Sequence, residues 1–360
     1  MENTKKSLHL ALHGGGAHGA FTWGALDVLL ADGRLTPAGI SGTSAGAVNA
    51  VALAHGWVQA QDAGRDPFEG ARASLGRVWS QVMALGAISE SAARIVRVML
   101  GAQPSSRAEN LSPYQDNPLD YNPLRRLIVQ EIDFDRLARL EWPRVFVAAT
   151  DVETGRAEIF SGQRLNAQAV LASCCLPQLF QAPEIDGRLY WDGGYSANPA
   201  LDPLVEMKHT NDILLVQNST LRRAGQPASM TEIADHVNDL TFNASLIAQM
   251  RAIALINEMI ERGLTHPGLR PIRMHRIDSG QALTDLPARG KLSLQPVMLE
   301  RLFTSGRGSA RNWLKNSLHA VGQSSSIDLH RDYGEPTRID YDTSPAPAPQ
   351  AWSVRETVGA

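Results

Sequence analysis

Residues 8–49 contain two glycine-rich turns, and each stands between an expected strand and an expected helix. Apolar residues 8–12 lead into Gly14–Gly19 (GGGAHG), after which a helix is expected from about residue 21 to residue 31. Residues 39–41 lead into Gly42–Gly46 (GTSAG) and then into an alanine-rich helix that reaches about residue 55. Because adjacent parallel strands end at the same edge of a sheet, this stretch predicts an α/β fold with both turns at one ligand-binding edge.

Each turn has its own chemistry. Glycines allow a tight turn and leave main-chain N–H groups uncovered at the start of a helix, which makes an anion-binding site. The pattern Gly-x-Ser-x-Gly between a strand and a helix is typical of a nucleophile elbow, in which a strained turn holds one serine hydroxyl beyond the end of the sheet. Ser44 is therefore the candidate nucleophile, with small neighbours where the strand and helix backbones approach each other.

One alternative is a nucleotide-binding protein without catalysis. Gly14, Gly16 and Gly19 fit the dinucleotide pattern G-x-G-x-x-G, which calls for an acidic residue at the end of the second strand. Here that strand ends at Thr43 and Ser44, and the sequence has no Gly-Lys-Ser or Gly-Lys-Thr phosphate loop. A non-catalytic nucleotide- or acyl-binding protein stays as the alternative from another class.

A second alternative is an esterase of the α/β-hydrolase type. His13–Gly16 spells the HGGG oxyanion turn of such enzymes, although several strands should then precede the serine and only one does here. Its catalytic triad would need a histidine after the acid. Six histidines are available for that role: His209, His236, His266, His275, His319 and His330. His275 is the strongest of them because it lies near the end of an expected strand, but we expect no histidine to take part in the chemistry.

Composition limits the class of protein. The chain has 360 residues, 43% of them hydrophobic and 20% charged, which indicates a globular domain with a large core. A formal net charge of −3 leaves no broad basic surface, so we expect no nucleic-acid partner. No apolar run reaches 18 residues, and the two adjacent cysteines, Cys174 and Cys175, cannot join distant segments. We expect a cytoplasmic protein without a signal peptide, metal or cofactor.

Several further elements are expected along the chain. Residues 65–100 and 124–132 read as helical, 101–122 as a loop, and 144–150, 213–216 and 272–277 as strands. A helix is expected between residues 297 and 318, and a disordered tail over 342–360. Residues 231–261 predict a long amphipathic helix whose apolar stripe should pack in the core, with a membrane-facing or acyl-chain-lining role as the alternative. The stripe consists of Ile233, Val237, Leu240, Ala244 and Ile247.

The stretch 172–201 adds a carboxylate. Asp186-Gly187 between apolar residues predicts a tight hairpin, and its second strand runs through Tyr190 and Trp191 into Asp192-Gly193-Gly194. An isolated Asp-Gly-Gly is usually only a turn. Its significance here comes from the two motifs that precede it.

Taken in order, GGGAHG, GTSAG and ASCCLPQLF…DGRLYWDGG resemble the patatin-like phospholipase family over roughly residues 7–217. The resemblance implies a three-layer α/β/α fold with a mainly parallel central sheet. It also implies a catalytic dyad of Ser44 and Asp192, with the oxyanion hole at Gly14, Gly15 and Gly16. His18 stands where the family commonly has arginine, so no role is assigned to its side chain.

The resemblance further implies a lipid acyl hydrolase that acts on phospholipids, lysophospholipids or neutral acyl esters, with peripheral contact to a membrane. We expect one catalytic domain over residues 1–335, in which 218–335 form a helical C-terminal extension, followed by a tail over 336–360. An ordinary aspartate, with a pKa of about 3.9, is a weak base for a serine hydroxyl. Oxyanion stabilisation would therefore have to supply much of the rate.

Overall fold

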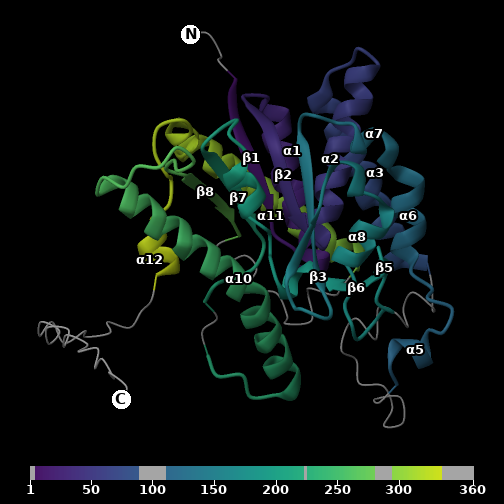
Figure 1. Ribbon diagram of the computed structural model, residues 1–360. Helices are drawn as coiled ribbons and strands as arrows, with labels where there is room; N and C mark the ends of the chain where they lie inside the picture. The colour runs from purple at the N-terminus through teal and green to yellow at the C-terminus, as the bar shows by residue number, and fades with distance from the viewer. Residues whose placement is uncertain (1–4, 89–110, 223–224, 280–293, 335–360) are drawn as a thin grey trace, which may run out of the picture.

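The computed structural model describes residues 5–88, 111–222, 225–279 and 294–334 (Figure 1). Its strands are β1 (Lys6–Leu12), β2 (Leu35–Thr43), β3 (Arg144–Asp151), β4 (Ala157–Phe160), β5 (Glu184–Ile185), β6 (Arg188–Asp192), β7 (Asp212–Gln217) and β8 (Arg273–Asp278). The long helices are α1 (Gly19–Asp32), α2 (Ala45–Asp62), α3 (Pro67–Ile88), α10 (Met230–Glu261) and α11 (Pro296–Asn316). The shorter ones are α5 (Pro113–Asp116), α6 (Pro123–Glu131), α7 (Phe134–Ala138), α8 (Ala167–Ser173), α9 (Asp202–Glu206) and α12 (Leu329–Tyr333).

One eight-stranded sheet organises these elements, in the order β5-β6-β3-β2-β1-β7-β8 with β4 paired to β3. The pairs β1–β2, β1–β7, β2–β3 and β7–β8 are parallel, whereas β4, β5 and β6 pair in antiparallel fashion. The expectation of a mainly parallel sheet is confirmed. β1 lies inside the sheet between β2 and β7. The chain therefore adds β2 on one side of β1 first and β7 on the other side later.

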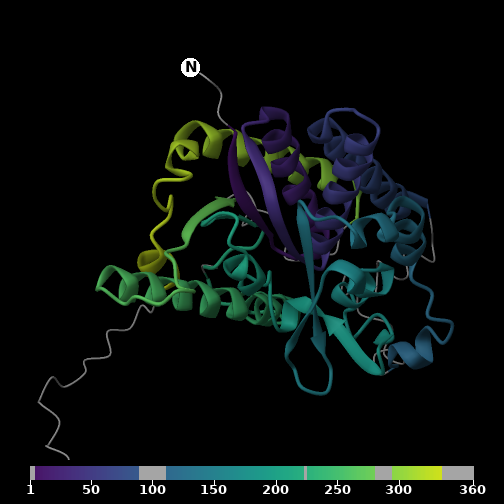
Figure 2. The same cartoon turned by 45° about the horizontal axis from the view of Figure 1, so that its top comes forward.

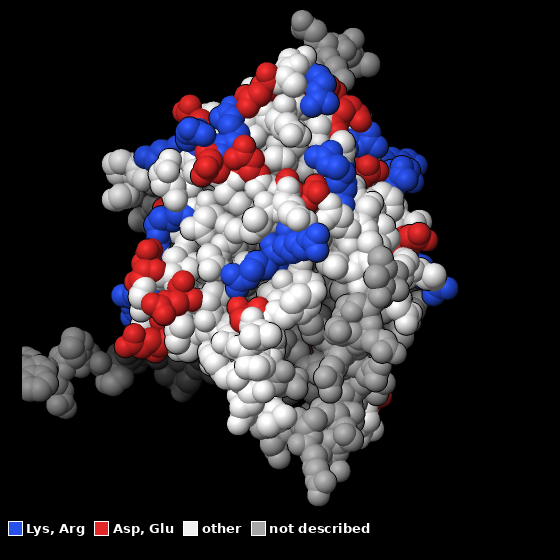
Figure 3. Space-filling view, turned by 90° about the vertical axis from the view of Figure 1, so that its right-hand side faces the viewer, with Lys and Arg blue, Asp and Glu red and all other residues white. Residues whose placement is uncertain are grey.

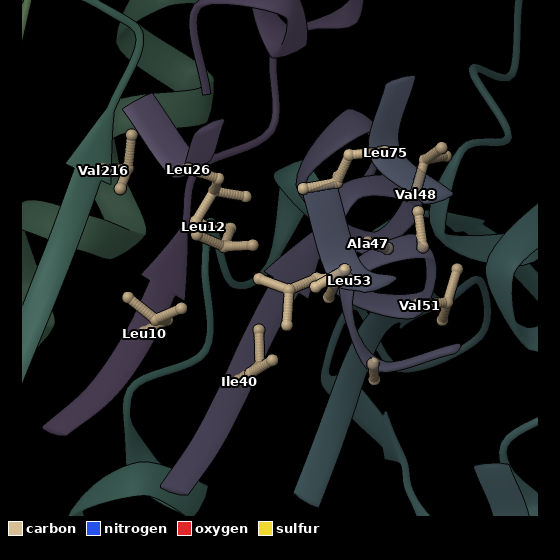
Figure 4. Close-up of a cluster of buried hydrophobic side chains, with 14 of the residues drawn as sticks. Leu10, Leu12, Leu26, Ile40, Ala47, Val48, Val51, Leu53, Leu75 and Val216 are labelled. Carbon is tan, nitrogen blue, oxygen red and sulfur yellow. The ribbon is translucent and has the colours of Figure 1, made fainter. Parts of the chain in front are cut away.

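Helices cover both faces of this sheet (Figure 1). Side chains alternate along each strand, so Leu214 and Val216 of β7 join one hydrophobic cluster and Ile213 and Leu215 join the other. The first cluster packs the sheet against α1, α2, α3 and α11, and Figure 4 shows its centre, with Leu10, Leu12 and Ile40 facing the helices. The second cluster packs the opposite face against α9, α10 and α12. The three-layer α/β/α arrangement is therefore confirmed.

Most expected elements occur, with shifted ends. The helix expected over residues 65–100 is described as Pro67–Ile88, and its last residues lie outside the described part of the chain, as does the tail expected over 342–360. Within the loop expected over 101–122, residues 101–110 are also outside, and residues 113–116 form α5. The four-residue strand β4 was not expected. Among the described residues it pairs with β3 alone, and this pairing depends on the tertiary fold.

The core-packing expectation for α10 is wrong over the first half of the helix. Ile233, Val237 and Leu240 are exposed, and so is Ala244. The buried face of α10 comes later in the chain, at Leu246, Met250, Ile253 and Ala254, where the helix crosses the sheet. The first half continues past the end of the sheet, where the strands offer it no surface to pack on (Figure 1).

Candidate functional site

The three sequence motifs meet at the carboxyl edge of the sheet. Leu12, at the end of β1, lies beside Gly42 of β2, so the turn after β1 and the turn after β2 leave the sheet at the same level. A Cβ placed on Gly14 would come within 3.0 Å of the Ser44 Cβ and 2.7 Å of the Thr43 carbonyl oxygen. A Cβ on Gly193 would lie 2.9 Å from the Thr43 Cγ2. The Gly14 turn, the serine turn and the Asp-Gly-Gly turn are thus in mutual contact.

Ser44 stands at a strained position between β2 and α2. Its φ of 54° and ψ of −124° lie in a region that non-glycine residues avoid, as a nucleophile elbow requires. Its flanking glycines cannot be larger: a Cβ on Gly42 would approach the Gly46 carbonyl oxygen to 2.3 Å, and one on Gly46 would approach the Leu12 oxygen to 2.1 Å. The Ser44 amide donates to the Ser173 hydroxyl at 2.8 Å. Ser44 itself is partly exposed, so its hydroxyl can be reached from solvent.

Asp192 ends β6 and is buried beside this serine. Burial raises the pKa of its carboxyl to about 7, although hydrogen bonds from the Gly194 amide and the Ser44 hydroxyl oppose that rise. The Gly194 amide donates to Oδ1 at 2.8 Å, and the Thr150 hydroxyl donates to the Asp192 main-chain oxygen at 2.8 Å. Asp192 is therefore held in place and is a much stronger base near neutral pH than an ordinary aspartate.

The glycine turn offers fewer oxyanion donors than the sequence suggested. The Gly14 amide donates to the Asn198 Oδ1 at 2.7 Å, so it is already used within the protein. The amides of Gly15 and Gly16 have no partner in the described part of the chain, as is usual where a helix begins. Gly16 also has a φ of 56°, which favours glycine. We correct the expectation accordingly: Gly14 positions the turn, and Gly15 and Gly16 carry the available N–H groups.

Buried polar side chains hold the glycine turn in place by hydrogen bonds, and the sequence analysis did not predict them. Asn198 connects the Gly14 amide to the His13 ring, with its Nδ2 3.2 Å from His13 Nε2. Asn218, which follows β7, donates from its side-chain amide to the His13 carbonyl oxygen at 3.0 Å. The main-chain carbonyl oxygen of Asn218 lies 3.1 Å from His18 Nδ1. The Asn-Pro pair at 198–199, soon after Asp-Gly-Gly, was the only available signal. Gly14, whose amide bonds to Asn198, lies 184 residues earlier in the chain.

His275 lies far from Ser44. It is buried in β8, its Nε2 is 3.0 Å from Asp212 Oδ1, and its Nδ1 is 3.1 Å from the Ser326 hydroxyl. Strand register places His275 three strands away from β2 and several residues nearer the opposite edge of the sheet. His275 and Ser44 are therefore separated by about 20 Å. Burial alone would raise the pKa of Asp212, but hydrogen bonds from His275, Arg273 and the Gly322 amide hold it far below the ordinary value. This cluster joins β7 to β8 and the chain after α11.

Two cysteines adjoin the site as free thiols. Burial, with the Asp192 charge nearby, raises the pKa of Cys174 well above 9 despite an opposing hydrogen bond with Ser44. Burial likewise raises the pKa of Cys175 to about 12. Both thiols therefore stay protonated at neutral pH, which leaves Ser44 without a thiolate competitor.

The described residues contain no group of three or more His, Cys, Asp or Glu side chains placed to hold a metal ion. Across the same residues, no helix combines the length and the apolar character needed to span a bilayer.

Comparison with known proteins gives two findings. A family model described as "Patatin-like phospholipase" matches residues 10–205, which include all three motifs. Among solved structures, the crystal structure of VipD from Legionella pneumophila is similar with a TM-score of 0.38 and 15% sequence identity, over 92% of this chain and 73% of that chain. No curated protein sequence gave a significant match.

Proposed function

Because the chain belongs to the patatin-like phospholipase family, a family of lipid acyl hydrolases, we propose that it cleaves lipid acyl esters with Ser44 and Asp192 as its catalytic pair. One observation carries this proposal. A strained, solvent-accessible serine stands beside a buried carboxyl whose pKa is raised to about 7. Each residue suits its role: the serine is presented to substrate, and the carboxylate can accept a proton near neutral pH.

In the first half of the reaction, the Ser44 Oγ forms a bond to the ester carbonyl carbon while its proton passes to Asp192. The carbonyl oxygen becomes an oxyanion, which the Gly15 and Gly16 amides can bind. One donor of this kind is worth about 3 kcal/mol in comparable sites. The intermediate then breaks its bond to the alcohol oxygen, and that oxygen takes the proton from Asp192 as it leaves.

In the second half, water gives a proton to Asp192 as its oxygen attacks the acyl carbon. The new intermediate breaks its bond to the Ser44 Oγ, which regains the proton from Asp192, and the carboxylic acid is released. The steps consume one ester and one water. The choice among phospholipids, lysophospholipids and neutral esters depends on contacts beyond this pair.

We also propose a cytoplasmic location. The free thiols of Cys174 and Cys175 beside the site support it, because adjacent unpaired cysteines are typical of a reducing compartment.

The direct test is labelling with a fluorophosphonate, which reacts with activated serines. We expect the wild-type chain to be labelled and Ser44→Ala to remain unlabelled. Ser41→Ala is the matched control: this serine is buried in β2 three residues earlier and its hydroxyl has no partner in the described structure, so the variant should be labelled like wild type. An unlabelled wild-type chain would instead favour a non-catalytic acyl-binding protein.

A second test examines the pairing itself. Ser44→Ala, Asp192→Asn and the double variant should lose turnover to the same degree, because residues that act as one unit are not additive. A double variant much slower than either single variant would show that the two side chains act independently.

A further inference from the structure

The first half of α10 shows its apolar side to solvent. Met230, Ile233, Val237 and Leu240 are between 38% and 75% exposed. At 3.6 residues per turn, these four side chains fall within an arc of about 80°, and they cover about 15 Å of the helix. They form one continuous stripe, which we call the α10 stripe.

The opposite side of this half-helix is acidic and less exposed. Asp235 and Asp239 are partly buried, whereas Val237 and Leu240 are exposed. A helix at the surface of a globular protein normally has the reverse arrangement, with its apolar side against the core. An exposed apolar stripe on an amphipathic helix indicates a binding surface.

A second exposed apolar segment surrounds α5. Leu111, Tyr114, Leu119 and Tyr121 are between 49% and 90% exposed, and we call them the α5 segment. In Figures 1 and 2, α5 and the start of α10 both lie at the end of the molecule where the parallel strands finish. Tyrosine is a side chain that favours the interface between lipid and water.

Both surfaces connect directly to the candidate site. On α10, Phe242 follows the stripe by two residues, and its ring lies 5.1 Å from that of Tyr195, in the turn after Asp192. On the other side, Gln181 Nε2 donates to the Asn117 carbonyl oxygen in the α5 region at 2.9 Å. The loop that contains Gln181 also contains Cys175, whose carbonyl oxygen accepts from the Asp192 amide at 2.7 Å. The two apolar surfaces therefore flank the edge at which Ser44 is exposed.

Charge distinguishes the partners that this end can bind. Residues 225–250 include three acidic residues and no lysine or arginine, and residues 111–121 include two acidic residues and again no lysine or arginine. In Figure 3, the coloured charges gather over the upper part of the molecule, and the described surface of the lower end is largely white. Anionic lipid attracts basic segments, so it does not match this end. An apolar surface without positive charge matches zwitterionic lipid.

We propose that the α10 stripe and the α5 segment dock the protein on a zwitterionic lipid surface, with the Ser44 edge facing the lipid. This inference rests on the proposed function, which supplies a reason for the site to face lipid. A membrane also suits the geometry, because one flat apolar phase can contact two segments on opposite sides of the site.

The test uses full-length protein carrying Ser44→Ala, so that no lipid is consumed, and phosphatidylcholine vesicles in a flotation assay. We expect the protein to float with the vesicles. The pair Val237→Asp and Leu240→Asp, and separately Leu119→Asp and Tyr121→Asp, should each reduce vesicle partitioning at least about tenfold. The matched control is Leu255→Asp with Met259→Asp. These side chains lie on the same helix and are 56% and 43% exposed, but they come after the part that crosses the sheet.

The same substitutions in the active chain should leave kcat/KM for a soluble short-chain ester unchanged, because they lie outside the proposed catalytic groups. The proposal is overturned if phosphatidylcholine is not bound, if the control pair loses as much binding as the stripe pair, or if only vesicles with added phosphatidylserine bind. A lipid-free dimer that the stripe substitutions abolish would also overturn it, in favour of a second copy as the occupant.

The two proposals can fail separately. Stripe-dependent flotation of the Ser44→Ala chain, together with a wild-type chain that fluorophosphonate does not label, would remove the catalytic proposal and keep the docking surface. Labelling of Ser44 in the wild-type chain, without flotation of the Ser44→Ala chain, would keep the catalytic proposal and remove the docking surface.

Discussion

At the scale of single residues, the buried carboxyl of Asp192 controls the expected pH dependence. The proposed mechanism requires its base form, and burial raises its pKa to about 7. We therefore expect kcat/KM for a soluble ester to rise about tenfold per pH unit below this value and to level off above it. Asp151→Asn is the control, because that carboxyl has a lowered pKa and is already ionised, so the midpoint should not move. A midpoint near 4 would contradict a desolvated base.

The same pKa shift makes a prediction about stability. Between about pH 4 and pH 7 the folded chain holds a proton on Asp192 that the unfolded chain has released, so this group lowers stability as the pH rises. Asp192→Asn keeps the acceptor for the Gly194 amide and removes the charge. At about pH 8 it should raise the free energy of unfolding by up to about 4 kcal/mol, and the gain should vanish near pH 4. Denaturant unfolding at both pH values measures this, and equal stabilities at pH 8 would contradict it.

Asn198 is expected to position the glycine turn without touching substrate. Asn198→Ala frees the Gly14 amide and lets the turn shift, which we expect to lower kcat by up to about 100-fold with little change in KM. Asn257→Ala is the matched control, because it removes an asparagine of α10 that bonds to the Ile272 main-chain N–H and carbonyl oxygen, away from the turn. Should both variants lose kcat equally, the effect would be one of general stability.

At the scale of elements, the serine turn depends on how closely β1, β2 and α2 approach one another. A Cβ on Gly46 would meet the Leu12 carbonyl oxygen at 2.1 Å, and main chain cannot move aside as a flexible side chain can. We expect Gly46→Ala to cost at least about 3 kcal/mol of stability. Gly76→Ala, in α3 with open space at its Cβ, should instead stabilise the protein by about 1 kcal/mol. Thermal unfolding of both variants would show opposite shifts, and a stable Gly46→Ala would disprove the close approach.

Local pattern was enough to predict these elements. The order strand, glycine turn and helix is repeated at residues 8–31 and 39–55, and each piece follows from its own residues. The orientation of α10 could not be predicted in this way, because apolar periodicity marks one side of a helix without saying where the sheet beneath it ends. The bond between Asn198 and Gly14 was equally hidden, since it joins segments that only the folded sheet brings together.

At the scale of the whole molecule, the two edges of the sheet have different tasks. The edge opposite Ser44 carries the His275, Asp212 and Ser326 cluster, which connects β7, β8 and the C-terminal segment. His275→Ala should therefore retain most of the kcat/KM for a soluble ester while lowering the free energy of unfolding by about 1–3 kcal/mol. His319→Ala, at an exposed position, should change neither. If folded His275→Ala lost as much activity as Ser44→Ala, a triad would replace the proposed pair.

The distance in sequence between the members of the site has a consequence for protein synthesis. A growing chain that has just passed β2 already contains Ser44, but Asp192, the last residue of β6, is added much later, and Asn198 must still return to Gly14 across 184 residues. An unfinished or prematurely terminated chain that stops before β6 therefore has a serine without its proposed base and a glycine turn without the Asn198 side chain that supports it. On the proposed mechanism, such a fragment cannot cleave an ester.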